Sequence, residues 1–185
     1  MRKILLLLGL LLILCAFNWA VWQREPLLRD GTVMYLRLAP VDPRAFLLGD
    51  YMDLSFAIDL DITDALYDEA RKNNKATSRF ELQRELPREG HVVVTLSPQR
   101  VAEFLRLEDG SSLSSNEHKL HFRLKSGRAY VTAQSFFFQE GHAQDYEEAI
   151  YGEIHVDPEG KNLLTHLLDD NLQRIDPGAP KDEVQ

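Results

Sequence analysis

The chain has 185 residues, and its 29 acidic and 21 basic side chains give a formal net charge of -8. A negative surface repels phosphate backbones and anionic lipid, so the composition disfavours nucleic acid as a partner. The single cysteine, Cys15, lies in an apolar segment. This position excludes disulfides, thiolate nucleophiles and cysteine-ligated metals from the rest of the chain, which has the length of one ordinary domain.

The N-terminal segment predicts a transmembrane helix and a membrane anchor over residues 1–23. The stretch from Ile4 to Trp22 carries no charge, and at about 1.5 Å per helical residue it can cross the roughly 30 Å hydrocarbon core of a bilayer. Two basic residues precede it, which keeps the N-terminus cytoplasmic and sends the remainder across. A cleaved signal peptide is the alternative, but Asn18 stands where a cut after Ala20 requires a small residue. We therefore expect the anchor to be retained.

Two strands are predicted in the first part of the remaining chain. Residues 31–38 are rich in valine, tyrosine and leucine and end at a proline-containing turn. Residues 52–60 alternate strictly between apolar and polar side chains, which predicts a strand with one face in the core and one in water. On this pattern Phe56 and Leu60 point inward, while Asp59 points outward with the other aspartates.

The middle of the chain predicts a short helix, a polar excursion and two strands. Apolar residues recur at helical spacing over 62–70, whereas 73–90 is polar and charged and reads as a long connection. Residues 91–96 resume as a strand. Residues 101–107 fit either a strand or a helix, and we favour an antiparallel strand because a Ser-Pro turn precedes them.

Two hairpins close the predicted domain. Residues 119–124 and 129–138 flank a glycine-containing turn, and 150–156 and 161–168 flank an Asp-Pro-Glu-Gly turn. At most a helical turn lies between the hairpins. We expect a mainly β domain over 24–175, a barrel or sandwich with one or two short helices, followed by a disordered charged tail over 176–185.

The sequence carries no recognised catalytic motif. A dinucleotide glycine fingerprint, a phosphate loop, paired zinc histidines and a nucleophile elbow are all missing from it. We therefore predict no catalytic residue, no metal ligand and no cofactor, and we expect a non-enzymatic role more than an enzymatic one.

Two segments have unusual chemistry, and their side chains are the candidate binding residues. In the first, a glycine gives a tight entry to Asp50 and Tyr51, which either stabilise a turn or face a cleft. The second is an aromatic strand that runs into an acidic loop over 136–147. Its candidates are Glu140, His142, Tyr146 and Glu147. Glu140 and His142, with Asp145, have the chemistry of metal ligands or of an acid–base pair, but their spacing is equally typical of an exposed loop.

Together these segments resemble the GDYXXLXY family of membrane-anchored bacterial proteins. Gly49, Asp50, Tyr51 and Leu54 stand in the places of the motif, and Phe56 replaces its last tyrosine, which removes a hydroxyl group. An aromatic run, a Glu-Gly pair and a Tyr-Glu pair over 136–149 are similar to a later pattern of the family. The resemblance implies a single-pass protein of the bacterial inner membrane with its domain in the periplasm. It also implies a polytopic membrane protein as a possible partner.

Three hypotheses for function follow. The leading one is a non-catalytic periplasmic module that binds a membrane or envelope partner through the surface around Asp50, Tyr51 and the 140–147 loop. The alternatives are an envelope hydrolase that pairs Asp50 with Glu140 or His142, and a sensor of a small ligand. A concave pocket that joins Asp50 to Glu140 would favour either alternative.

Overall fold

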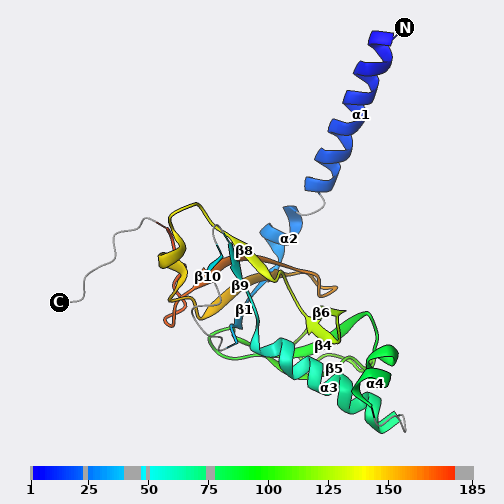
Figure 1. Ribbon diagram of the computed structural model, residues 1–185, viewed down its shortest axis with the longest axis vertical. Coiled ribbons are helices and arrows are strands. Elements are labelled where there is room, and N and C mark those ends of the chain that lie inside the picture. The colour runs from blue at the N-terminus through cyan, green and yellow to red at the C-terminus, as the bar shows by residue number, and fades with distance from the viewer. Residues whose placement is uncertain (1, 23–24, 40–46, 49–50, 74–77, 178–185) are drawn as a thin grey trace, which may run out of the picture.

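The computed structural model describes residues 2–22, 25–39, 47–48, 51–73 and 78–177. Helix α1 (Arg2–Trp22) extends away from the folded domain, and the short helix α2 (Glu25–Asp30) leads into it (Figure 1). Among the described residues, no helix combines the length and the apolar character of a membrane span. The predicted disordered tail falls almost wholly on residues outside the description.

The domain itself is mainly β, as predicted. Its strands are β1 (Thr32–Arg37), β2 (Leu47–Leu48), β3 (Tyr51–Asp53), β4 (Glu89–Leu96), β5 (Ala102–Leu107), β6 (Glu117–Lys125), β7 (Arg128–Tyr130), β8 (Ser135–Phe137), β9 (Tyr151–Val156) and β10 (Asn162–Leu168). Its described helices are α3 (Ala57–Asn73), α4 (Arg79–Glu85) and the short 3-10 helix η2 (Ala143–Tyr146).

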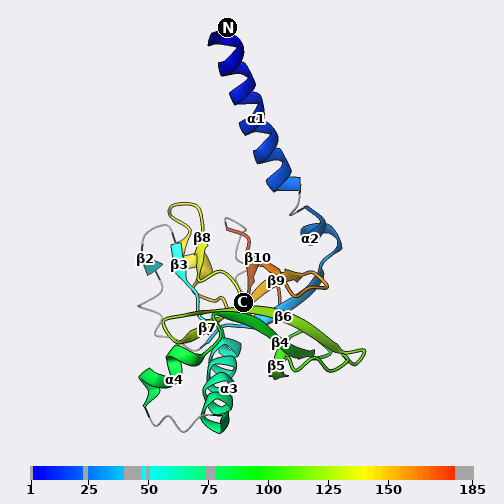
Figure 2. The same ribbon diagram turned by 90° about the vertical axis from the view of Figure 1, so that its right-hand side faces the viewer.

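Two antiparallel sheets join to form one curled wall (Figure 2). One sheet has the order β1-β9-β10 and the other has the order β5-β4-β6-β7. A parallel bridge between Tyr35 and Val101 connects them, and the Tyr35 N–H donates to the Arg100 carbonyl at 2.9 Å. At the other side, the His121 N–H donates to the Gly160 carbonyl at 2.8 Å. The β9–β10 turn is thereby fixed against β6.

A third, small sheet of order β2-β3-β8 brings together the two segments that the sequence marks as unusual. Tyr51 pairs with Phe137, Met52 with Phe136 and Asp53 with Ser135. We call β2, β3 and β8 the motif sheet. It lies at the same end of the domain as α2, whereas α3 and α4 lie at the opposite end (Figures 1 and 2).

The strand predicted over 52–60 is wrong beyond Asp53, because α3 begins at Ala57. Ile58 and Ile62 fit both a strand period and a helix period, and the helix wins because Asp59 caps it. The Asp59 Oδ2 atom accepts the Phe56 N–H at 3.3 Å, as an acid at the third helical position does in a capping box. Asp59 is therefore 2% exposed and Leu60 is 42% exposed, the reverse of the predicted faces.

The other predictions for the domain are mixed. Strands over 91–96 and 101–107, and the hairpins around 125–128 and 157–160, are confirmed. The polar excursion over 73–90 contains helix α4, which buries Leu82 and Leu86. The strand predicted over 129–138 breaks into β7 and β8, which belong to different sheets. Strong local polarity hid α4, and no local signal marks the change of sheet.

Two buried polar side chains attach α3 to the edge of β7. The Asp59 Oδ1 atom accepts the Val131 N–H at 3.0 Å, and the Thr63 Oγ1 atom accepts the Ala129 N–H at 2.9 Å. These contacts satisfy the N–H groups of Val131 and Ala129, which would otherwise need a neighbouring strand as their hydrogen-bond partner. Burial raises the pKa of Asp59 to about 6, and the N–H groups of Val131 and Phe56 oppose this rise.

We predict that Phe56→Asp unfolds the domain while Asp53→Ala leaves its stability almost unchanged. Phe56 is 1% exposed, and an unpaired carboxylate there costs several kcal/mol. Asp53 is exposed, where substitutions usually change stability by about 0.5 kcal/mol or less. Thermal unfolding of the two variants checks this. Equal melting temperatures would contradict the assignment of Phe56 to the core.

We also predict that Asp59 makes the domain less stable as the pH rises from 4 to 7. Since the folded-state pKa of Asp59 is raised to about 6, the folded state binds this proton more tightly than the unfolded chain does. The contribution is full below about pH 4 and is lost as the pH rises through 6, by at most about 3 kcal/mol.

Urea titrations of the wild type and Asp59→Asn at pH 4, 5.5 and 7 measure this contribution. The stability of the wild type relative to the variant should fall across the series. Asp61→Asn, an exposed carboxylate on the same helix, is the matched control and should give a constant difference. If the difference in stability is also constant for Asp59→Asn, the Asp59 carboxyl has the same pKa in the folded and unfolded states.

Candidate functional site

The motif sheet presents an aromatic pair. The Tyr51 and Phe137 rings lie across the β3–β8 pairing with their centroids 5.8 Å apart. Tyr51 is half-buried, whereas Phe137 is 76% exposed. Among the described residues, β8 has β3 as its one strand neighbour, so its outer edge carries unpaired backbone groups. An exposed ring at a free sheet edge is suited to contact with another chain.

Tyr146, a predicted binding residue, lies instead in the core. It is 5% exposed and its ring packs against Phe136 and Phe138 at centroid distances of 5.4 and 5.2 Å. Burial, with the charges of Asp145 and Asp176, raises the pKa of the Tyr146 phenol. The residue therefore fixes the acidic loop to the end of β8.

The other predicted loop residues lie at the surface. Glu140 and Glu147 are exposed, and a half-buried His142 forms a hydrogen bond with the Asp145 Oδ2 atom at 2.8 Å. This bond spans one turn of η2 and orders the loop locally. Tyr51 pairs with Phe137 directly before the loop, whereas Asp50 lies outside the described residues. Within the described part of the chain, no group of three or more acidic, histidine or cysteine side chains is arranged to hold a metal ion.

The second half of the family-like motif builds the core. Leu54 is 5% exposed, and the Phe56 ring packs so closely on β9 that a Cβ atom at Gly152 would lie 2.9 Å from it. The Leu54 N–H donates to the Gln134 carbonyl at 2.6 Å. The motif thus joins the motif sheet to α3 and to the connection between β7 and β8.

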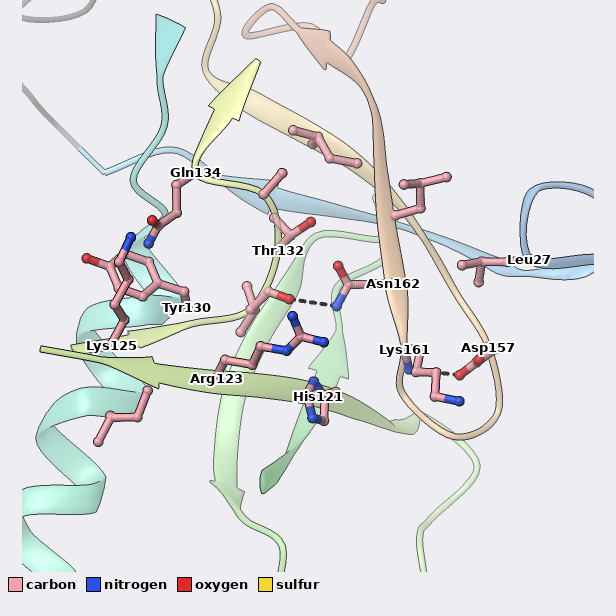
Figure 3. Close-up of a pocket in the computed structure, with 15 residues that line it drawn as sticks. Leu27, His121, Arg123, Lys125, Tyr130, Thr132, Gln134, Asp157, Lys161 and Asn162 are labelled. Carbon is pink, nitrogen blue, oxygen red and sulfur yellow. Dashed lines mark hydrogen bonds between the residues drawn. The ribbon is translucent and has the colours of Figure 1, made fainter. Parts of the chain in front are cut away.

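A cleft of about 770 Å³ lies beside that connection, between β6 and the start of β10 (Figure 3). It was not predicted from the sequence. Its walls come from α2, from the second half of β6, from the β7–β8 connection and from the β9–β10 hairpin. They are lined by Leu27, His121, Arg123, Leu124, Lys125, Tyr130, Val131, Thr132, Ala133, Gln134, Asp157, Lys161, Asn162, Leu163 and Leu164.

Most of the charged side chains that line the cleft are positive, whereas the chain as a whole has a net negative charge. Arg123, Lys125 and Lys161 line it, and Asp157 is the single carboxylate among the described lining residues. The pKa of His121 is lowered, first by burial and further by cationic neighbours that include Arg123 and Lys161. None of the three cationic side chains has an ion pair with a described residue.

A neighbouring cleft of about 630 Å³ shares His121, Arg123 and Lys161 with the first and is also lined by the carboxylates Glu89, Glu108 and Glu159. There, Lys119 forms an ion pair with Glu108, which also lies 3.7 Å from the His91 ring nitrogen. His121 faces Glu89 at 3.8 Å. The sequence does contain one signal for this cluster, since His121 and Arg123 alternate along the strand predicted over 119–124 and Lys125 follows at the same spacing. It contains none for the approach of Lys161, which depends on the tertiary fold.

Comparison with known proteins agrees with the motif. No curated protein and no solved structure matches the chain. The family model described as GDYXXLXY protein matches residues 13–167, a range that begins within α1 and ends one residue before the end of β10. Since this match covers most of the sequence, the chain belongs to the GDYXXLXY protein family.

Proposed function

We propose that this protein is a non-catalytic binding module, anchored in the bacterial inner membrane, whose domain lies in the periplasm and contacts a membrane or envelope partner. The observation that carries the proposal is the exposed Phe137 ring beside Tyr51 on the motif sheet. Exposed aromatic side chains of this kind are typical anchors of protein–protein interfaces.

The geometry of the motif sheet supports recognition by strand addition. Among the described strands β8 pairs with β3 alone, so a strand of the partner can pair with its other edge while Phe137 enters an apolar pocket of the partner. Main-chain hydrogen bonds then supply affinity, and the aromatic pair supplies specificity. The role predicted for Tyr51 fits this arrangement, and the exposed Glu140 and Glu147 follow β8 in the chain.

The contacts and the solvent exposure of the loop side chains favour a binding role over hydrolysis. His142 is engaged by Asp145, and Glu140 is exposed to solvent. A general acid or base works best with a pKa tuned by a partner or by burial in a concave site. In the described loop, Glu140 and Glu147 are exposed rather than enclosed in a concave site.

The membrane location is supported by the N-terminal sequence and by the surface of α1. The uncharged stretch from Ile4 to Trp22 has the length of a bilayer span and follows two basic residues. The described side chains of α1 over residues 9–19 are exposed, and most of them are apolar. The motif sheet shares its end of the domain with α2, which favours a partner in the same membrane, such as a polytopic protein.

We predict that Phe137→Ala releases the partner when the anchored protein is purified from native membranes with its associated proteins. Tyr51→Ala should weaken the same association. Phe80→Ala is the matched control, because Phe80 is 64% exposed on α4 at the opposite end of the domain. All three variants should keep melting temperatures within a few degrees of the wild type. Retention of the same proteins by Phe137→Ala and Phe80→Ala would exclude the motif sheet as the interface.

We further predict that the protein is extracted from membranes with its first residues intact. Mass measurement of the detergent-extracted protein should give the mass of the full chain, and a protease added from outside should digest the domain in spheroplasts but not in intact cells. A species that lacks the first ~20 residues would identify the segment as a cleaved signal peptide and remove the anchor from the proposal.

A further inference from the structure

A cluster of cationic side chains lines the cleft between β6 and β10. Arg123 and Lys161 come from separate elements, and both contribute to the lowered pKa of His121. Elsewhere the domain pairs cations such as Arg106 and Arg174 with carboxylates. Glu89 lies opposite Arg123 on β4 and Glu159 lines the adjoining cleft, but neither Arg123 nor Lys161 has an ion pair with a described residue.

Rigid backbone holds both cations in place. Arg123 lies on β6, which pairs with β4 on one side and with β7 on the other. Lys161 stands in the β9–β10 turn, where its own N–H donates to the Asp157 Oδ1 atom at 2.8 Å. The next residue, Asn162, donates from Nδ2 to the Val131 carbonyl at 2.7 Å, a bond drawn in Figure 3. The backbone positions from which the two side chains extend are therefore fixed, which lowers part of the entropic cost of holding a ligand between them.

We infer that this cleft binds the phosphate group of an organic phosphate ester, with Arg123 and Lys161 as its principal contacts. A planar guanidinium can hold two oxygens of a phosphate while an ammonium group contacts a third. A monovalent carboxylate would leave one of the two cations uncompensated. Leu27, Leu163 and Leu164 line the same cleft and provide an apolar wall for the organic part of the ester. The volume of about 770 Å³ is within the range of sites for small ligands.

Such an ester has two possible sources, a soluble metabolite and the headgroup of an anionic phospholipid. The second source is supported by Leu27, which belongs to α2, the helix that follows α1. The net charge of -8 acts against any anionic ligand at long range. Charges beyond about 8 to 10 Å are screened at physiological salt, so the local cations determine the potential inside the cleft.

The test uses the full chain in neutral detergent micelles. In the soluble arm, titration calorimetry compares glycerol 3-phosphate with inorganic phosphate and with glycerol. In the lipid arm, native mass spectrometry compares retained phosphatidylglycerol with retained phosphatidylcholine. We expect glycerol 3-phosphate to bind more tightly than inorganic phosphate, glycerol to show no binding, or the anionic lipid to be retained over the zwitterionic one.

The cleft variant is Arg123→Gln with Lys161→Gln, and the control is Arg71→Gln with Lys72→Gln, which removes the same charge from the exposed end of α3. The cleft variant should weaken binding at least about tenfold, while the control should keep it. Its melting temperature should be equal to or above that of the wild type, since it removes unpaired like charges.

The outcomes distinguish the two sources of the ester and decide whether the inference holds. Cleft-dependent binding in the lipid arm identifies a headgroup, and cleft-dependent binding in the soluble arm identifies a free ester. Absence of binding in both arms overturns the inference, and so does equal weakening by the cleft variant and the α3 control. Since Phe137 lies outside this cleft, loss of the partner from Phe137→Ala tests the proposed function separately.

Discussion

The architecture depends on the buried junction between the start of α3 and the edge of β7. A single carboxylate, Asp59, caps the helix and accepts the Val131 N–H, and Thr63 repeats this contact one helical turn later at Ala129. A helix thus takes the place of a strand at the margin of the larger sheet. Because β7 ends at Tyr130, the chain is then free to leave this sheet and enter the motif sheet at Ser135.

The motif of the family has two physical roles in this arrangement. Leu54 and Phe56 are core residues, and Phe56 requires the missing side chain of Gly152 to reach its position. Tyr51 instead lies at the surface beside Phe137. The loss of a hydroxyl at position 56 therefore affects a packed interior, whereas any recognition of a partner rests on the first half of the motif.

Sequence reasoning succeeded where the pattern of side chains was local. The hairpin turns and the strands over 91–96 and 101–107 follow from alternation and turn chemistry. It failed at 57–60, where alternation and helical spacing coincide and a cap decides between them. It also missed α4, since a seven-residue helix with one deeply buried leucine carries little periodic signal.

The candidate sites also combine features that the sequence predicts with features that depend on the tertiary fold. The aromatic and acidic segments were visible in the sequence, but the burial of Tyr146 was not, because it depends on rings that come from β8. The basic cleft was hidden by the net charge, which averages over the whole surface. The cations of the cleft come together only because the β9–β10 turn lies against β6 in the tertiary fold. Lys119, which also lies on β6, is instead paired with Glu108.

The pairing of β1 with β9 constrains how the domain is made. Thr32 is opposite Val156, so the first strand of the domain is completed by one of the last. A chain that emerges from its N-terminus must carry β1 unpaired until nearly all of it has been synthesised or exported. Contacts of such long sequence separation slow folding and expose strand edges in the meantime. The domain is therefore expected to complete its fold only once β9 is available to pair with β1.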